Sequence, residues 1–306
     1  MVCLCLLHGC SCDSDDDDDT TLPGDDDSGP ADDDDSGSVD DDDDSTPLAW
    51  SAGDAATLAS TLGNNVGLYS LAACEFSDEV FFTNLHSLGV GVVSTADGTL
   101  VDVIDLGDVT DDTVPLFPHV VCLPGTGAIA VNNRLAGEVI RIDAGTHEVL
   151  DVHPVCEQPG WLETEAQTGN LLVACLTTGE IVRLDGATLT PLETYVLGDV
   201  RPTSFAVTPA HLVVVDELRG RLSLFDRGDG SLVDQVDVDG WPSQIDVWDS
   251  DTFYVSAREF GTVLEIQATP QLEVVGEFEA GSDPFGVTAL TDRQRLYVVA
   301  RQGAEV

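Results

Sequence analysis

The feature that most constrains the fold is a repeat of about forty residues, which recurs five times along the chain. Each copy has a proline, an apolar stretch, a β-rich run and then a glycine. The prolines are 41, 43, 40 and 42 residues apart and the glycines 42, 41, 41 and 42 apart, at Pro118, Pro159, Pro202, Pro242 and Pro284 and at Gly137, Gly179, Gly220, Gly261 and Gly303. No sustained stretch has the three- and four-residue apolar spacing of an amphipathic helix. The sequence therefore predicts an all-β fold, a β-propeller.

Each repeat divides into four short strands, which in the fifth copy are predicted at 243–248, 252–257, 261–267 and 272–279. The second strand is nearly all apolar, as at 212–215, so both of its faces should be covered. The fourth strand is acidic, with Asp234 and Asp237 in one copy and Glu273 and Glu277 in the next. This gradient indicates blades whose middle strands are sandwiched between neighbours and whose last strand meets water.

The ends of the chain bear on how the ring closes. Residues 55–66 look like the end of a repeat, and the first full repeat runs from about 66 to 107, with its second strand at 81–84. Residues 284–306 supply only three strands. We expect the 55–66 segment to complete that last blade as its outer strand, which gives six blades and removes the exposed edges. A truncated seven-bladed propeller is the alternative, because the last strand stops short of its counterparts.

Two groups of residues carry a family resemblance. Residues 285–300 resemble the YVTN repeat of bacterial propellers, the YncE-like group, and residues 137–143 and 179–185 resemble the strand that follows it. The likeness covers about residues 55–306. NHL-type propellers have a similar sequence pattern. The pair Trp248-Asp249 occurs once, in the first hairpin of its repeat, whereas a WD repeat has this pair at the end of the third strand. A WD-repeat assignment is therefore excluded. The resemblance implies mainly binding and scaffolding outside the cytoplasm, and catalysis only in some relatives.

The N-terminal part is of a different composition. Residues 13–44 contain 18 Asp and neither Lys nor Arg. Such a segment cannot bury enough apolar surface to offset its ordering entropy, so residues 13–54 are predicted to be a disordered, hydrated spacer. A calcium-binding role is the alternative, although the spacing of an EF-hand loop is absent.

Residues 1–12 resemble part of a lipoprotein signal. Leu7-His8-Gly9-Cys10 is similar to a bacterial lipobox, which makes Cys10 the expected site of lipidation. His8 stands where a small residue is usual, and the nine residues before Cys10 are fewer than a secretory signal needs, so we expect the true start upstream of Met1. The predicted location is the bacterial cell envelope, anchored by lipid in the periplasm or on the outer membrane, with residues 55–306 as the propeller.

The charge of the chain excludes some partners. The net charge is −46, and outside residues 13–44 it remains −28, since 39 acids stand against 11 arginines. Nucleic acid and anionic lipid surfaces require a basic footprint, so neither is expected as a partner. No apolar run is long enough to span a bilayer, and membrane contact is expected only through the lipid anchor. We expect a monomer that binds a protein, a glycan or a small molecule.

Four cysteines lie in the predicted propeller: Cys74, Cys122, Cys156 and Cys175. No Cys-x-x-Cys pair occurs among them, which argues against a zinc or thioredoxin-like site. Two disulfides with three connectivities are compatible with an oxidising compartment. Cys156–Cys175 is the best single pair, because the strand ends that carry them should lie on the same rim. Buried free thiols are the alternative.

Candidate site residues come from the first strand of each blade, which lines the central channel of a propeller. Positions two and four residues after each repeat proline should face the channel. They are Val120, Trp161, Ser204, Gln244 and Gly286, and Cys122, Glu163, Ala206, Asp246 and Thr288. The intervening Leu162, Phe205, Ile245 and Val287 should face neighbouring blades, and His119 is expected at the surface.

Two function classes follow from these residues. Nucleophile, phosphate-loop and dinucleotide motifs are absent, so no catalytic residue or cofactor is assigned. We expect a non-catalytic binding or scaffold propeller. The alternative is a lactonase-like envelope enzyme that holds Ca²⁺ or another divalent cation on Glu163 and Asp246, as gluconolactonase-type propellers hold a metal in the channel.

Overall fold

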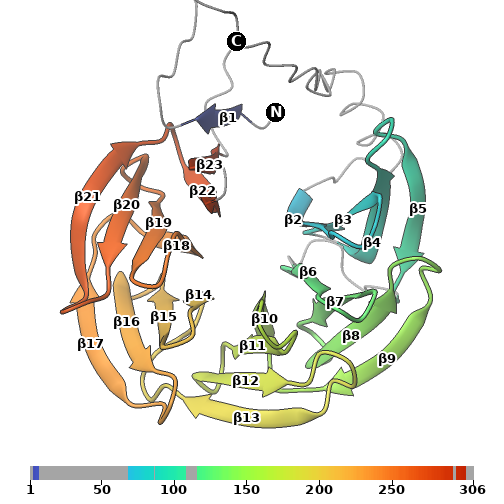
Figure 1. Ribbon diagram of the computed structural model, residues 1–306, viewed down its shortest axis with the longest axis horizontal. Helices are drawn as coiled ribbons and strands as arrows, with labels where there is room; N and C mark the ends of the chain where they lie inside the picture. Colours follow the sequence, from blue (N-terminus) through green and yellow to red (C-terminus); the bar gives the residue numbers. More distant parts are fainter. Residues whose placement is uncertain (1–2, 7–67, 86, 108–115, 292–293, 301–306) are drawn as a thin grey trace, which may run out of the picture.

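The computed structural model describes residues 3–6, 68–85, 87–107, 116–291 and 294–300. They form five four-stranded antiparallel sheets and the inner strand pair of a sixth, arranged as blades around a central channel (Figure 1). The predicted all-β propeller is confirmed. The strands of the five complete blades are β2 (Leu68–Ala73), β3 (Glu79–Asn84), β4 (Ser87–Ser94) and β5 (Leu100–Asp105); β6 (Val120–Leu123), β7 (Ala128–Asn133), β8 (Glu138–Asp143) and β9 (Val149–Pro154); β10 (Pro159–Thr164), β11 (Leu171–Cys175), β12 (Glu180–Leu184) and β13 (Pro191–Val196); β14 (Ser204–Val207), β15 (His211–Asp216), β16 (Arg221–Asp226) and β17 (Leu232–Asp237); β18 (Pro242–Val247), β19 (Thr252–Ala257), β20 (Thr262–Gln267) and β21 (Glu273–Glu279).

The sixth sheet contains β22 (Pro284–Leu290) and β23 (Arg295–Ala300), with β1 (Cys3–Leu6) paired antiparallel to β23. Residues 3–6, which the sequence assigns to a leader segment, thus lie at the sheet edge that a third strand would otherwise cover. An open edge offers unpaired backbone N–H and C=O groups to any extended segment. The closing strand expected at 55–66 and the strand expected after Gly303 lie outside the described residues.

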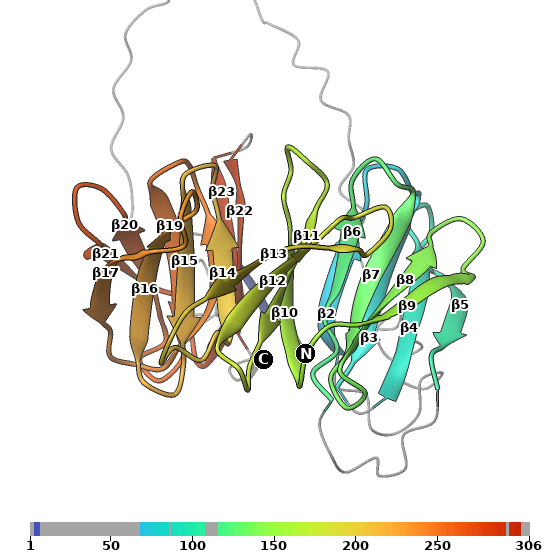
Figure 2. The same ribbon diagram turned by 90° about the horizontal axis from the view of Figure 1, so that it is seen from below.

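Burial follows the predicted gradient across each blade. The second strand β11 is buried along its whole length, whereas four of the six residues of the outer strand β17 are exposed. Buried apolar side chains form one cluster between each pair of successive blades, from the first blade to the sixth. The blades therefore stand side by side around the ring (Figure 2).

The repeat glycine has a steric cause. Gly137, Gly179, Gly220 and Gly261 open the third strands with φ between 60° and 76°, the left-handed region that favours glycine. A Cβ at any of them would lie 2.7–2.8 Å from the carbonyl oxygen of the segment that leads to the next blade. The spacing of the glycines thus marks the turn where each blade contacts its outgoing connection.

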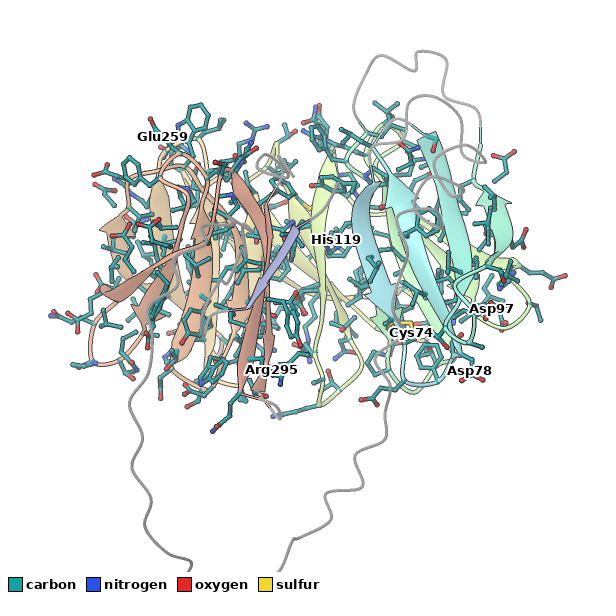
Figure 3. The ribbon with its side chains drawn as sticks, turned by 90° about the horizontal axis from the view of Figure 1, so that it is seen from above. Cys74, Asp78, Asp97, His119, Glu259 and Arg295 are labelled. Atoms are coloured by element: carbon teal, nitrogen blue, oxygen red, sulfur yellow. A yellow bond between two sulfur atoms is a disulfide. The ribbon has the colours of Figure 1, made fainter. Side chains whose placement is uncertain are left out.

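Two disulfides join residues of the propeller. Cys156 and Cys175, the pair that the sequence favoured, are bonded within the third blade. Cys74, which follows β2, is bonded to Cys122 in β6, so this disulfide links the first blade to the second (Figure 3). None of the described residues forms a helix long and apolar enough to cross a bilayer.

Candidate ligand-binding site at the mouth of the channel

Each inner strand runs along the channel from one rim to the other, so its successive residues reach different depths. In β10, Gly160 and Trp161 line a cavity at one rim, whereas Glu163 and Thr164 line a cavity near the opposite rim. The channel thus offers two places where side chains from several blades converge.

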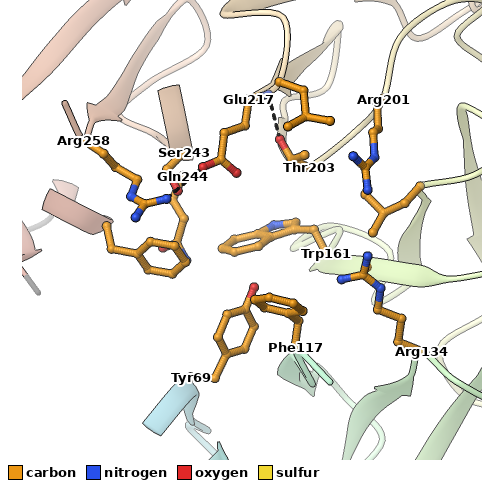
Figure 4. A pocket seen from close by; sticks show the side chains of 14 residues that line it. Tyr69, Phe117, Arg134, Trp161, Arg201, Thr203, Glu217, Ser243, Gln244 and Arg258 are labelled. Atoms are coloured by element: carbon orange, nitrogen blue, oxygen red, sulfur yellow. Dashed lines mark hydrogen bonds and ion pairs between the residues drawn. The ribbon is translucent and has the colours of Figure 1, made fainter. Parts of the chain in front are cut away.

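The first place is a cavity of about 400 Å³, which we call the aromatic–arginine pocket (Figure 4). Its size lies in the range of small-molecule sites. Side chains from all six blades or their connections line it; those that give it its chemistry are Tyr69, Phe117, Trp161, Phe285, Arg134, Arg201, Arg258 and Glu217.

The aromatic side chains form connected walls. The rings of Tyr69 and Phe117 meet edge to face with centroids 5.5 Å apart, and those of Tyr69 and Phe285 lie 6.1 Å apart. This contact joins the first blade to the sixth. Trp161 crosses the pocket opposite Tyr69 and Phe117 (Figure 4). Phe117 has φ 52°, a conformation that a bulky residue adopts only when its surroundings hold it there.

His119 supports the tryptophan ring. Its own ring lies 4.0 Å from the Trp161 ring, centroid to centroid, and Leu162 N–H donates to His119 Nδ1 at 3.4 Å. Burial lowers the pKa of His119 to about 3, so the imidazole is neutral. The expectation of a surface histidine was wrong: the residue after the repeat proline enters the blade interface instead of remaining at the strand edge.

The arginines of the pocket fall into two kinds. Arg258 lies 5.4 Å over the Phe285 ring and is neutralised by Glu217 at 2.9 Å and Asp283 at 2.8 Å. Arg134 and Arg201, in contrast, have no carboxylate of the described residues within ion-pair distance. Both lie on the same side of the pocket (Figure 4).

Electrostatics within the pocket reflect this imbalance. Burial, and then the positive charge of Arg201, lower the pKa of Arg134. Its guanidinium lies 5.2 Å over the Phe117 ring, which gives it a cation–π partner but no counter-charge. The carboxylate that contacts the backbone of Arg201 is already engaged, because Asp216 accepts from Arg201 N–H and pairs with the Arg219 side chain at 2.7 Å.

Sequence reasoning missed most of this pocket, although the repeat contained a signal. The turn position three residues before each repeat glycine supplies a lining residue in four successive blades. These residues are Arg134, Leu176, Glu217 and Arg258. Because the side chains differ in chemistry, only the shared position, and not a residue type, could have identified them.

The predicted channel residues are placed unevenly. Trp161 and Gln244 line the aromatic–arginine pocket, as expected of channel residues. Cys122 does not offer a free side chain, since it is in the disulfide with Cys74 and packs against the cluster between the first two blades. Thr288 is exposed, and Gly286 is half-buried.

Three other channel predictions were wrong. Val120, Ser204 and Ala206 are buried at 1%, 1% and 2% exposure, in contact with neighbouring blades. The Ser204 hydroxyl accepts the N–H of Ile245 in the next blade. These side chains are small enough for the blades to close over them. The prediction that four other residues face neighbouring blades is confirmed. Each belongs to an apolar cluster between two blades: Leu162, Phe205, Ile245 and Val287.

Glu163 and Asp246 are brought together across the channel. Burial, and then the charge of Asp246, raise the pKa of Glu163 to about 8. Burial also raises the pKa of Asp246, whose carboxylate accepts the N–H groups of Val247 at 2.7 Å and Ala289 at 2.8 Å. The pair therefore carries a proton near neutral pH. Among the described residues, no group of three or more His, Cys, Asp or Glu is arranged to hold a metal ion.

Beside this pair lies an ion-pair network that the sequence did not predict. Glu165, 5% exposed, accepts from Arg183 at 2.9 Å and from Arg227. Burial alone would raise the pKa of Glu165, but hydrogen bonds from Thr168 and Arg183 outweigh it and lower the pKa. The two arginines of this second cavity are thus paired within the protein. Cys10, the predicted lipidation site, lies outside the described residues.

A scan against known protein families finds none that matches the chain, and no curated protein matches it either. Solved structures similar to this chain include the following three. Hydrazine synthase of Kuenenia stuttgartiensis has a TM-score of 0.62 at 14% identity, over 77% of this chain and 74% of that one. A catalytically inactive variant of virginiamycin B lyase from Staphylococcus aureus, with quinupristin, has 0.59 at 12%, over 74% and 75%. Kluyvelomyces marxianus Hsv2 has 0.51 at 12%, over 76% and 69%. At these identities the likeness shows the fold alone, and it agrees with the blades described above: this chain is a β-propeller.

Proposed function

We propose that this protein is a non-catalytic propeller that binds a ligand at the mouth of its channel. The observation that carries the proposal is the aromatic–arginine pocket, where four aromatic rings and two arginines without a carboxylate partner among the described residues converge. Concave sites that combine apolar walls with a few polar groups are typical of ligand binding. In the second cavity, in contrast, Arg183 and Arg227 are already paired with Glu165.

We further propose that the propeller belongs to the YVTN-repeat, YncE-like group and is displayed at the bacterial cell envelope. The YVTN-like residues 285–300, the lipobox-like Leu7-His8-Gly9-Cys10 and the Asp-rich residues 13–54 support this. In this arrangement a lipid on Cys10 anchors the chain, and the self-repelling spacer holds the propeller away from the membrane. Both disulfides are compatible with an oxidising compartment.

The binding proposal is tested by removing the largest ring of the pocket. Small aromatic compounds of negative, neutral and positive charge are titrated into the purified chain by calorimetry, with Trp161→Ala and Trp241→Ala variants alongside. Trp241 is 59% exposed and does not line the pocket. We expect Trp161→Ala to weaken binding about tenfold or more, as for a central aromatic contact, and Trp241→Ala to leave it unchanged.

Circular dichroism and melting curves confirm that both variants are folded before titration. Binding that is insensitive to Trp161→Ala, or no binding by any compound of the panel, would contradict the proposal.

A further inference from the structure

The charge of the aromatic–arginine pocket is opposite to that of the protein. The chain carries a net charge of −46, and of its nine arginines in the described residues six are paired with carboxylates. Of the three arginines that line the pocket, Arg258 is paired with Glu217 and Asp283, whereas Arg134 and Arg201 have no carboxylate of the described residues within ion-pair distance. The chain has only eleven basic residues against 57 acids. Two neighbouring arginines without a carboxylate partner among the described residues are therefore unusual, and they make this part of the pocket favourable for a negatively charged group.

Three acids of this rim, Glu217, Asp283 and Asp216, are already engaged by arginines. Glu217 is held by Arg258 at 2.9 Å, and its backbone N–H donates to the Thr203 hydroxyl. Asp216, 1% exposed, is held by Arg219 and by the backbone of Arg201. The side chains of Arg134 and Arg201 therefore repel each other at a half-buried site, and an anion between them would relieve that repulsion.

The rest of the pocket favours a flat, apolar body. Trp161, which packs against the His119 ring, lies opposite the edge-to-face pair of Tyr69 and Phe117 (Figure 4). Aromatic rings prefer to pack against other rings, offset or edge to face, at such distances. The guanidinium of Arg134 over Phe117 keeps its planar N–H fork available for a carboxylate next to that body.

Resting on the proposed binding function, we propose that the ligand is a small aromatic carboxylate, with its carboxylate between Arg134 and Arg201 and its ring between Trp161 and the Tyr69–Phe117 pair. An adjoining cavity of about 750 Å³ shares Phe117 and Arg134 with the pocket, so a substituent on the ring has space to extend there.

The test uses the full chain and three probes: 2-naphthoate, its uncharged analogue 2-naphthamide, and acetate. We expect 2-naphthoate to bind about tenfold more tightly than 2-naphthamide, because charge-assisted hydrogen bonds to two arginines are lost in the amide. Acetate, which lacks the ring, should bind more weakly than either probe.

The variant that tests the anion contact is Arg134→Gln/Arg201→Gln. It should weaken 2-naphthoate about tenfold or more and leave 2-naphthamide nearly unchanged. The matched control is Arg221→Gln, which also removes an arginine but lies in β16, where Arg221 pairs with Asp237 away from the pocket. Melting curves establish that the variants are folded.

The outcomes separate the two proposals. Equal affinity for 2-naphthoate and 2-naphthamide, or an equal effect of Arg221→Gln, would overturn the carboxylate inference, while Trp161-dependent binding of a neutral or cationic compound would keep the binding function. If no compound binds in a Trp161-dependent way, both proposals fall.

Discussion

Glu163 and Asp246 are the residues whose ionisation the fold changes most clearly in the channel. The pKa of Glu163 is raised to about 8, so the folded protein holds a proton that the unfolded chain releases near pH 4.5. The stabilisation from this proton is therefore complete below about pH 4.5 and is lost as the pH rises through about 8. The raised pKa of Asp246 acts in the same direction.

Replacing Glu163 with Gln should flatten this pH dependence. Between pH 5 and 9 we expect the free energy of unfolding of the parent to fall by at least about 1 kcal/mol relative to Glu163→Gln, since one pKa unit corresponds to about 1.4 kcal/mol. Urea unfolding at several pH values measures the difference. Glu259→Gln, at an exposed turn residue, serves as the control and should follow the parent.

A divalent cation bound by Glu163 and Asp246 would favour their ionised forms, whereas the shared proton favours a neutral carboxyl. Bound to the native state, it would keep both carboxylates ionised and stabilise the protein by mass action. A melting temperature that EDTA lowers by several degrees in the parent, but not in Glu163→Gln/Asp246→Asn, would contradict the shared proton. It would favour the lactonase-like enzyme instead.

At the scale of the elements, the two disulfides constrain different parts of the fold. Cys74–Cys122 spans 48 residues and joins two blades, whereas Cys156–Cys175 spans 19 residues within one blade and its entry. Closing a longer loop removes more entropy from the unfolded chain. The interblade bond should therefore contribute more to stability.

Replacing each pair with alanine tests this. We expect Cys74→Ala/Cys122→Ala to cost about 4 kcal/mol and Cys156→Ala/Cys175→Ala about 3 kcal/mol in chain-entropy terms. Urea unfolding of oxidised protein measures both, and reductant should remove the difference between each variant and the parent. A larger loss for the intrablade pair, or free thiols at all four positions under oxidising conditions, would be inconsistent with this.

At the scale of the whole molecule, the propeller and the acidic N-terminal part are proposed to act as a displayed binding unit. Expressed in a bacterial host behind a complete signal peptide, the chain should incorporate labelled fatty acid and sediment with membranes. Cys10→Ser should abolish both, because the lipid is the proposed anchor. Cys12→Ser, two residues away, is the matched control and should behave as the parent. Labelling that survives Cys10→Ser would contradict the lipid anchor.

The sequence by itself determined the blades. The period of the prolines and glycines located the strands, as β19 (Thr252–Ala257) and β20 (Thr262–Gln267) show for strands predicted at 252–257 and 261–267. Period and apolarity are local properties, because each blade must bury the same faces and turn at the same glycine. Leu162 and Ile245 were placed between blades for this reason.

Only the tertiary structure decided the site. Trp161 lies in β10, Arg134 in the turn between β7 and β8, and Arg201 between β13 and β14, and they meet because the ring brings these segments to one rim. Alternation along a strand could not show that Ser204 and Ala206 would be covered by the next blade, since that depends on how closely the blades approach. Nor could it show that Arg134 and Arg201 lack carboxylate partners among the described residues, because pairing across blades is fixed by the closed arrangement and not by distance along the chain.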